Sequence, residues 1–303
     1  MSLVIVSRKS PLALWQAEHV RDRLHALHPG RPLEIHGMTT AGDRSLDTPL
    51  ARIGGKGLFV KELEEQLLAG RAAMAVHSLK DVTVDLPPGL CLGAILARAD
   101  VRDALVSPAY AGIAALPPGA RVGTASLRRR CLLGQSRPDL RVEEVRGNVG
   151  TRLKRLDAGE FDALLLAAAG LERLGLQERI RAYLPVAEFL PAIGQGALGI
   201  ECRIADAETL RLIAPLHDPA TAACVRAERA FNRRLGGSCQ IPVAGHAHWV
   251  GENISLQVRI FGRQGTVLVG ERAGPAAAPE ALGEAVAEKV LARGARALLN
   301  EWL

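Results

Sequence analysis

Residues 121–135 read RVGTASLRRRCLLGQ, a short apolar strand that passes directly into a helix. The same order recurs in three other segments: LVIV at 3–6 before a helix that Ser10 caps and Pro11 opens, MAVH at 74–77 before SLKD, and DALLLAAAG at 162–170 before the short helix LERLG. Strands that alternate with helices in this way predict parallel sheets with helices on both faces.

The C-terminal part of the chain has a different pattern. The glycine-rich segment LPAIGQGALGIECR at 190–203 fits a crossing between two lobes. After Pro219 the sequence predicts one helix, then the strands ISLQVRIFG at 254–262 and TVLVGER at 266–272, and then a final helix from Pro279. Grouped strands with a helix at either end indicate a small α+β domain.

Size and composition narrow the function. With 303 residues the chain is longer than one hydrophobic core usually supports, so two or three domains are expected. The 38 basic residues exceed the 32 acidic ones, which favours an anionic ligand. Aromatic residues make up only 3% of the chain, too few for a surface on which bases stack, so we expect no nucleic-acid partner.

The sequence predicts neither a membrane segment nor a disulfide framework. The longest uncharged apolar run, ALLLAAAGL, falls far short of the roughly 20 residues that span a bilayer. The N-terminus lacks the basic region of a signal peptide, so a cytoplasmic protein is expected. The five cysteines form no C-x-x-C pair. His246 and His248 could bind a metal with Cys239, but their alternate spacing favours one face of a strand, and no metal site is predicted.

Polar and basic side chains gather directly after the predicted strands, where ligands bind in open α/β sheets. They are Arg8, Ser10, Lys80, Asp81, Thr124, Ser126, Arg128, Arg129, Arg146, Arg152 and Arg173. Each arginine taken singly fits a solvated side chain. Together they predict a site for a ligand with several carboxylates or phosphates, which guanidinium groups match bidentately. Asp81 is the one carboxylate closely following a strand, and it fits either an acid–base role or an anchor for an arginine.

Two further segments combine glycines with a reactive side chain. In ARIGGKGLFVKELEEQLLAG at 51–70 a glycine-rich turn precedes an amphipathic helix. Gly57 follows Lys56 where a phosphate loop has serine or threonine, so the segment fits a hinged loop over a site. LGGSCQIP at 235–242 places Cys239 in a flexible loop, which is unusual for a cysteine that serves packing.

Seven ordered motifs together resemble the porphobilinogen deaminase family over nearly the whole chain. They are SRKSPLALWQA, GGKGLFVKELE, AVHSLKDV, VGTASLRRR, VRGNVGTRL, LPAIGQGALGIECR and GGSCQIPV. The resemblance implies an α/β fold: two periplasmic-binding-protein-like lobes with parallel-rich mixed sheets, plus a small α+β third domain. We place the first lobe at 1–97, completed by about 196–215, the second at 98–195, and the cysteine-carrying domain at 216–303.

The resemblance also implies the activity. Members of this family join four porphobilinogen molecules head to tail, with loss of ammonia, onto a dipyrromethane primer. A cysteine holds the primer covalently. The enzymes release hydroxymethylbilane for tetrapyrrole synthesis. Porphobilinogen is therefore the expected small-molecule substrate, and a tetrapyrrole-cyclising enzyme is the expected downstream partner. No extensive apolar interface is indicated, so a monomer is expected.

The resemblance implies a role for each residue of this chain that matches a functional residue of the family. Asp81 would be catalytic, stabilising the cation left when ammonia departs and exchanging protons at pyrrole nitrogens. The cofactor would be bound by Cys239, Lys80, Thr124, Ser126, Arg128 and Arg129. The substrate or growing chain would be bound by Arg8, Ser10, Arg146, Arg152 and Arg173, with Lys56 on a mobile lid. At Arg52, Ala125 and Ser238 the chain differs from residues that are common in the family. None of these differences removes a charged catalytic position, so they affect details of binding and not the activity.

Two other interpretations stay open on the residues alone. A non-catalytic anion-binding module of the same two-lobed shape would explain the arginines and leave Cys239 unexplained. A cysteine-dependent hydrolase or thiol transferase would use Cys239 directly and would need a histidine base. His246 and His248 are the only close candidates, and no family motif connects them to the cysteine.

Overall fold

The structure is a computed structural model that describes residues 2–40, 60–237 and 241–302. The chain divides into two compact units, Met1–Arg98 with Ala197–Ala222 and Ala99–Gly196 with Ala223–Leu303. None of the helices within the described ranges has the length and apolar content that crossing a membrane requires.

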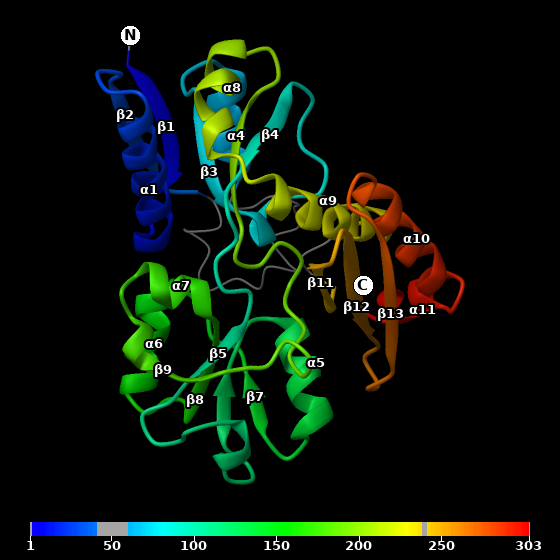
Figure 1. Ribbon diagram of the computed structural model, residues 1–303. Helices are drawn as coiled ribbons and strands as arrows, with labels where there is room; N and C mark the ends of the chain where they lie inside the picture. Colours follow the sequence, from blue (N-terminus) through cyan, green and yellow to red (C-terminus); the bar gives the residue numbers. More distant parts are fainter. Residues whose placement is uncertain (1, 41–59, 238–240, 303) are drawn as a thin grey trace. The chain divides into compact units, whose positions relative to one another are not determined.

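The first unit is built on a five-stranded sheet with the order β2-β1-β3-β10-β4 (Figure 1). Its strands are β1 (Leu3–Arg8), β2 (Leu33–Met38), β3 (Met74–Ser78), β4 (Leu90–Ile95) and β10 (Leu198–Arg203). Strand β1 pairs in parallel with β2 and β3, whereas β10 is antiparallel to β3 and β4. A segment from much later in the chain therefore completes this sheet.

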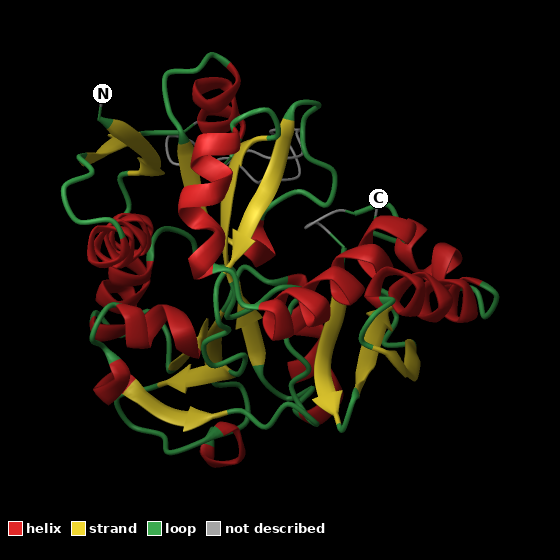
Figure 2. Ribbon diagram, turned by 45° about the horizontal axis from the view of Figure 1, so that its top comes forward, coloured by secondary structure: helices red, strands yellow, loops and turns green. Residues whose placement is uncertain are grey.

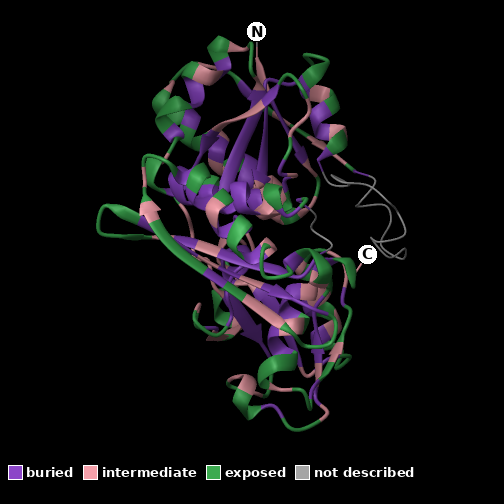
Figure 3. Cartoon of the chain, turned by 90° about the vertical axis from the view of Figure 1, so that its right-hand side faces the viewer, coloured by how far each residue is buried: buried purple, intermediate pink, exposed green. Residues whose placement is uncertain are grey.

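Helices cover both faces of this sheet, and successive strand residues alternate between the faces. Ile5 and Met74 share a core with helices α1 (Pro11–Leu27) and α8 (Ala207–Ile213) on one side. Val6 and Ala75 pack against α4 (Lys61–Leu68) on the other side. Figure 3 shows the strands as largely buried. Every second side chain of β1, β3 and β10 thus lies in the layer between the sheet and α4.

The second unit contains a sheet of the same design, with the order β7-β6-β8-β5-β9. Its strands are β5 (Asp103–Val106), β6 (Arg121–Gly123), β7 (Arg141–Glu143), β8 (Ala163–Ala167) and β9 (Ile180–Tyr183). Strand β6 is parallel to β7 and β8, and β5 is antiparallel to β8 and β9. Helix α5 (Leu127–Ser136) packs on one face, and α6 (Val149–Asp157) and α7 (Ala168–Arg173) pack on the other.

A three-stranded antiparallel sheet, β11-β12-β13, completes the second unit (Figure 2). Its elements are β11 (Val243–Val250), β12 (Asn253–Phe261), β13 (Val267–Pro275), and the helices α9 (Pro219–Arg234), α10 (Pro279–Leu291) and α11 (Ala295–Asn300). The helices share a core with one face of this sheet, around Phe231 and Val286. On the other face Ala244 and Phe261 join the core around α5. The backbone N–H of Gly245 donates to the Pro191 carbonyl at 2.9 Å, which ties this sheet to the preceding segment.

The structure confirms the predicted fold class and corrects two details. The sheets are mixed, as the resemblance implied, because β5 and β10 run against their neighbours; the alternation of strands and helices by itself had predicted parallel pairing. The strand predicted over 162–170 ends at Ala167, and α7 begins at Ala168. The small buried side chains of Ala168 and Ala169 let the first turn of α7 pack in the core, where their apolar character resembles a strand.

Candidate active site

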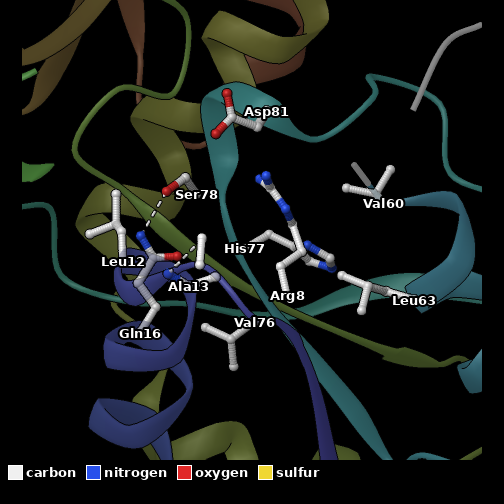
Figure 4. A pocket seen from close by; sticks show the side chains of 11 residues that line it. Arg8, Leu12, Ala13, Gln16, Val60, Leu63, Val76, His77, Ser78 and Asp81 are labelled. Atoms are coloured by element: carbon white, nitrogen blue, oxygen red, sulfur yellow. Dashed lines mark hydrogen bonds between the residues drawn. The ribbon is translucent and has the colours of Figure 1, made fainter. Parts of the chain in front are cut away.

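A pocket opens in the first unit at the carboxyl ends of β1 and β3 (Figure 4). Its polar lining residues are Arg8, Ser10, Gln16, His77, Ser78 and Asp81. Figure 4 shows Arg8 extending from β1 toward Asp81, with His77 beside it. The pocket therefore brings together three of the residues predicted from the sequence, Arg8, Ser10 and Asp81.

Local structure explains how these side chains are presented. Ser10 caps α1 as predicted, and its Oγ accepts from the Ala13 N–H at 3.4 Å. The buried Gln16 side chain donates to Ser78 Oγ at 2.8 Å and joins α1 to the end of β3. Asp81 ends a 3₁₀ turn, Leu79–Asp81, whose buried Leu79 anchors it, so the carboxylate itself stays exposed.

Lys80 lies in the same 3₁₀ turn and is partly buried. The turn is held at its start by the Leu79 N–H, which donates to the Ala197 carbonyl at 3.0 Å. An ammonium and a carboxylate thus follow β3 at adjacent positions on an anchored turn.

A second cluster lies at the N-terminus of α5 in the second unit. Ser126 caps this helix and accepts from the Arg129 N–H at 3.4 Å. Thr124, at the end of β6, is 2% exposed, and its Oγ1 accepts from the Ser126 N–H at 3.2 Å. Arg128 and Arg129 occupy the first turn, and both are buried although arginine rarely is.

Asp103 explains how two arginines can be buried together. Its carboxylate, 0% exposed, accepts from Arg129 Nε and Nη2 at 3.0 and 2.7 Å, and Arg128 Nη2 lies 2.8 Å away. Gln195 Nε2 donates to the same carboxylate at 3.0 Å. Burial alone would raise the pKa of Asp103, but the two guanidinium groups hold it well below its ordinary value. The carboxylate is therefore ionised throughout the neutral range.

The charges of this cluster do not balance. Two guanidinium groups face one carboxylate, and the positive end of the α5 dipole adds to the excess. Arg128 Nε is buried and has no hydrogen-bond partner among the described residues. Burial lowers the pKa of Arg128, and Asp103 opposes that shift. A site with this excess fits the carboxylates of an anionic ligand.

Three further predicted arginines lie in the second unit with existing contacts. Arg146 pairs with Glu144, with its Nε 2.7 Å from Oε1. Arg152 Nε donates to the Gly147 carbonyl at 2.8 Å. Arg173 Nη2 donates to the Gly196 carbonyl at 2.7 Å, and burial lowers its pKa to about 10.

The structure describes some of the residues predicted from the sequence and not others. Cys239 and Lys56, predicted as the attachment point and the lid residue, lie outside the described residues. His246 and His248 share one face of β11 as predicted, with their ring centroids 5.7 Å apart. No group of three or more metal-binding side chains occurs within the described ranges. Sequence reasoning missed Asp103, whose signal was a carboxylate inside the apolar strand DALV.

The fold and these two clusters define a class: an α/β protein with two sheets of one design, each presenting basic and hydroxyl groups after its strands for an anionic ligand. The chain belongs to the porphobilinogen deaminase family. The family description "Porphobilinogen deaminase, dipyromethane cofactor binding domain" matches residues 3–211, and "Porphobilinogen deaminase, C-terminal domain" matches residues 222–292.

One curated relative agrees with the family match, and two solved structures are similar in fold. The porphobilinogen deaminase of Thiobacillus denitrificans is 56% identical over 300 residues, which cover 99% of this chain and 98% of the relative. Among solved structures, a nutrient-binding protein from Burkholderia cenocepacia bound to methionine is similar with a TM-score of 0.44 and 11% identity, over 70% of this chain and 90% of that one. The VFT2 domain of Bordetella pertussis BvgS gives a TM-score of 0.42 and 18% identity, over 70% and 84%.

Membership establishes the activity. This is an enzyme of porphyrin biosynthesis with hydroxymethylbilane synthase activity, which polymerises porphobilinogen with the help of a dipyrromethane cofactor. The family, the activity and the cofactor predicted from the sequence are confirmed.

Proposed function

We propose that the pocket at the ends of β1 and β3 is where porphobilinogen reacts, with Asp81 as the catalytic residue. The observation that carries this proposal is the exposed Asp81 carboxylate in one pocket with Arg8 and Ser10. As ammonia leaves, positive charge develops on the methylene carbon of the substrate, and a carboxylate beside it stabilises that charge. Asp81 also accepts a hydrogen bond from a pyrrole N–H, while Arg8 and Ser10 bind the acetate or propionate of the substrate.

The cluster at the start of α5 is the proposed cofactor site. When bound, the dipyrromethane supplies a primer with several carboxylates. Arg128 and Arg129 would bind these carboxylates, and Thr124 and Ser126 would donate further hydrogen bonds. Lys80 of the first unit is also proposed as a cofactor-binding residue. The unbalanced positive charge beside Asp103 and the partnerless Arg128 Nε support this assignment. Cys239 is the proposed covalent attachment point.

Arg146, Arg152 and Arg173 are proposed to bind the growing chain. Each added pyrrole brings two carboxylates, so the ligand gains negative charge with every cycle. Arginine forks that are already oriented by Glu144, Gly147 and Gly196 lose little rotamer freedom when they bind such groups.

We further propose that the enzyme acts as a cytoplasmic monomer, with the cofactor cysteine on a C-terminal domain at 216–303. Six large hydrophobic residues of the described chain are exposed, and so small a number supports a monomer. They are Leu27, Leu68 and Ile204 in the first unit and Trp249, Val250 and Val269 in the second. The linear product is reactive and carries eight carboxylates, so an enzyme that cyclises tetrapyrroles is the expected consumer.

Intact-mass measurement of the purified protein tests this assignment. The expected result is an adduct of two-pyrrole mass that peptide mapping assigns to Cys239. Cys239→Ser should lack the adduct and the activity. Cys131→Ser, which alters another free cysteine of the second unit, should keep both. An unmodified wild-type chain from a host that makes porphobilinogen, or an adduct on another residue, would overturn the role of Cys239.

A further inference from the structure

Three ionisable side chains are buried together in the first unit, beneath the wall of the pocket. His77 on β3, Glu201 on β10 and Glu64 on α4 are 6%, 0% and 7% exposed. His77 Nε2 and Glu201 Oε2 lie 2.9 Å apart. The proposed chemistry of Asp81 uses none of these three groups, which we call the buried triad.

The strand register explains why they meet. His77 follows Ala75 by two positions on β3, and Ala75 packs against α4. Gly199 pairs with His77 and Glu201 pairs with Ala75, so the side chain of Glu201 lies on the same face of the sheet. Glu64 is on the buried side of α4, next to Leu63. All three groups therefore lie in the layer between the sheet and α4.

The triad is poorly suited to two negative charges. Glu64 Oε1 and Glu201 Oε1 are both buried without a hydrogen-bond partner among the described residues. Two ionised carboxylates in a site so inaccessible to solvent would repel each other and would lose their hydration. Burial, followed by the charge of Glu201, raises the pKa of Glu64 to about 7, although His77 opposes the shift. One carboxyl group thus holds a proton near neutral pH.

Other charged groups around the triad come from every neighbouring element. Glu65 on α4 adds to the repulsion felt by Glu64. Burial, and to a lesser extent the charge of Glu201, raises the pKa of the Cys91 thiol on β4. Arg203 on β10 donates to the Leu67 and Ala72 carbonyls around the end of α4. On the pocket side, Arg8 and Asp81 line the same wall as His77.

We propose that Glu64, His77 and Glu201 share protons as one unit, and that His77 is a positioning residue through which this unit sets how strongly the pocket attracts the carboxylates of the substrate. With Glu64 protonated, the carboxylate of Glu201 is the one negative charge of the triad behind the wall that His77 lines. When Glu64 loses its proton, a second negative charge lies behind the same wall and weakens the attraction. The inference rests on the proposed role of the pocket.

The consequence is a pH dependence of substrate binding. The Michaelis constant for porphobilinogen should rise between pH 6 and pH 8.5, while kcat changes less. One charge about 10 Å away in a medium of intermediate dielectric changes binding by about fourfold. Porphobilinogen itself keeps its charges over this range, because its carboxyl groups and its amine titrate well outside it.

Steady-state kinetics on the holoenzyme test the proposal. Glu64→Gln cannot lose a proton at this position, so its Michaelis constant should stay nearly flat over the same pH range. Glu65→Gln removes the same charge from the exposed neighbouring position and should keep the wild-type rise. Parallel profiles for wild type and Glu64→Gln would overturn the inference. Near-normal porphobilinogen consumption by Asp81→Ala would instead contradict the proposed role of the pocket.

A second measurement does not depend on activity. In protein labelled with ¹³C-histidine, the ring signal of His77 is assigned by its loss in His77→Gln. In wild type the chemical shift of this signal should change as Glu64 loses its proton near pH 7, and this change should be absent in Glu64→Gln and present in Glu65→Gln. An identical titration of the His77 ring in all three proteins would show that no proton is shared and would overturn the proposal.

Discussion

Arg129 binds the Asp103 carboxylate through two nitrogens, with Nε and Nη2 lying 3.0 and 2.7 Å from the same Oδ1 atom. Arg129 Nη1 meanwhile donates to the Leu165 carbonyl at 2.9 Å. All of this takes place in the core, where Asp103 is completely inaccessible. The pairing fixes the guanidinium plane before any ligand arrives, which lowers the entropy lost on binding.

Removing the charge of Asp103 should destabilise the protein strongly. Asp103→Asn leaves two buried guanidinium groups without a counter-charge, and breaking such a buried pair typically costs about 3–5 kcal/mol of unfolding free energy. Urea denaturation measures the loss. Asp157→Asn, which disrupts the exposed pair with Arg179, should change stability far less. Equal effects of the two substitutions would show that the Asp103 cluster does not hold the core together.

Asp81→Ala should separate cofactor assembly from turnover. We expect the two-pyrrole adduct to remain while porphobilinogen consumption falls by roughly 10²-fold or more, because the charge stabilisation for the departure of ammonia is lost. The readouts are intact mass and a colorimetric assay of remaining porphobilinogen. Asp85→Ala, an exposed carboxylate four positions later, should stay near wild type. Near-normal turnover of Asp81→Ala would make Asp81 a structural residue.

Loss of an arginine that is proposed to bind the growing pyrrole chain should stop elongation at a defined length. Arg146→Leu or Arg152→Leu removes a counter-charge for the lengthening polycarboxylate, so enzyme with a particular number of added pyrroles should accumulate. Mass spectra of enzyme incubated with limited substrate resolve these species. Lys154→Leu removes an exposed cation from α6, the helix that carries Arg152, and should give the wild-type distribution. A uniform slowing without any stalled species would argue against this role.

The pKa of Glu64 predicts a pH dependence of stability. Its folded value of about 7 lies above the ordinary 4.5, so the folded state holds the proton more tightly than the unfolded chain. This stabilisation is complete below the unfolded value and is lost as the pH rises toward about 7. The unfolding free energy of Glu64→Gln minus that of wild type should therefore rise by on the order of 2–3 kcal/mol between pH 4.5 and pH 8.

Denaturant titrations of both proteins across that range measure this difference. Glu65→Gln provides the control, because its exposed side chain should show no comparable trend. A difference between Glu64→Gln and wild type that stays constant with pH would mean that Glu64 is not protonated in the folded protein.

Much of the candidate site could be predicted because its residues follow strands. A polar residue after an apolar strand is visible in one dimension, as with Arg8 after LVIVS, Asp81 after MAVHSLK and Thr124 after RVG. The buried partners gave weaker signals. Asp103 and Glu201 appear only as single carboxylates within the strands DALV and LGIECR, and the sequence did not show which cations or histidines they meet.

The sequence by itself determined the elements, the family and the identity of the reactive groups, because hydrophobic periodicity, helix caps and local motifs depend on neighbours along the chain. The tertiary structure alone decided how these groups are paired. Sheet register places Glu201 beside His77 across 124 positions, and the packing of α5 on its sheet places Arg129 on Asp103. The sequence contains no visible repeat, yet both sheets have one strand order, with the antiparallel strand β10 or β5 inserted between two others. Such pairings depend on long-range packing, which no local pattern encodes.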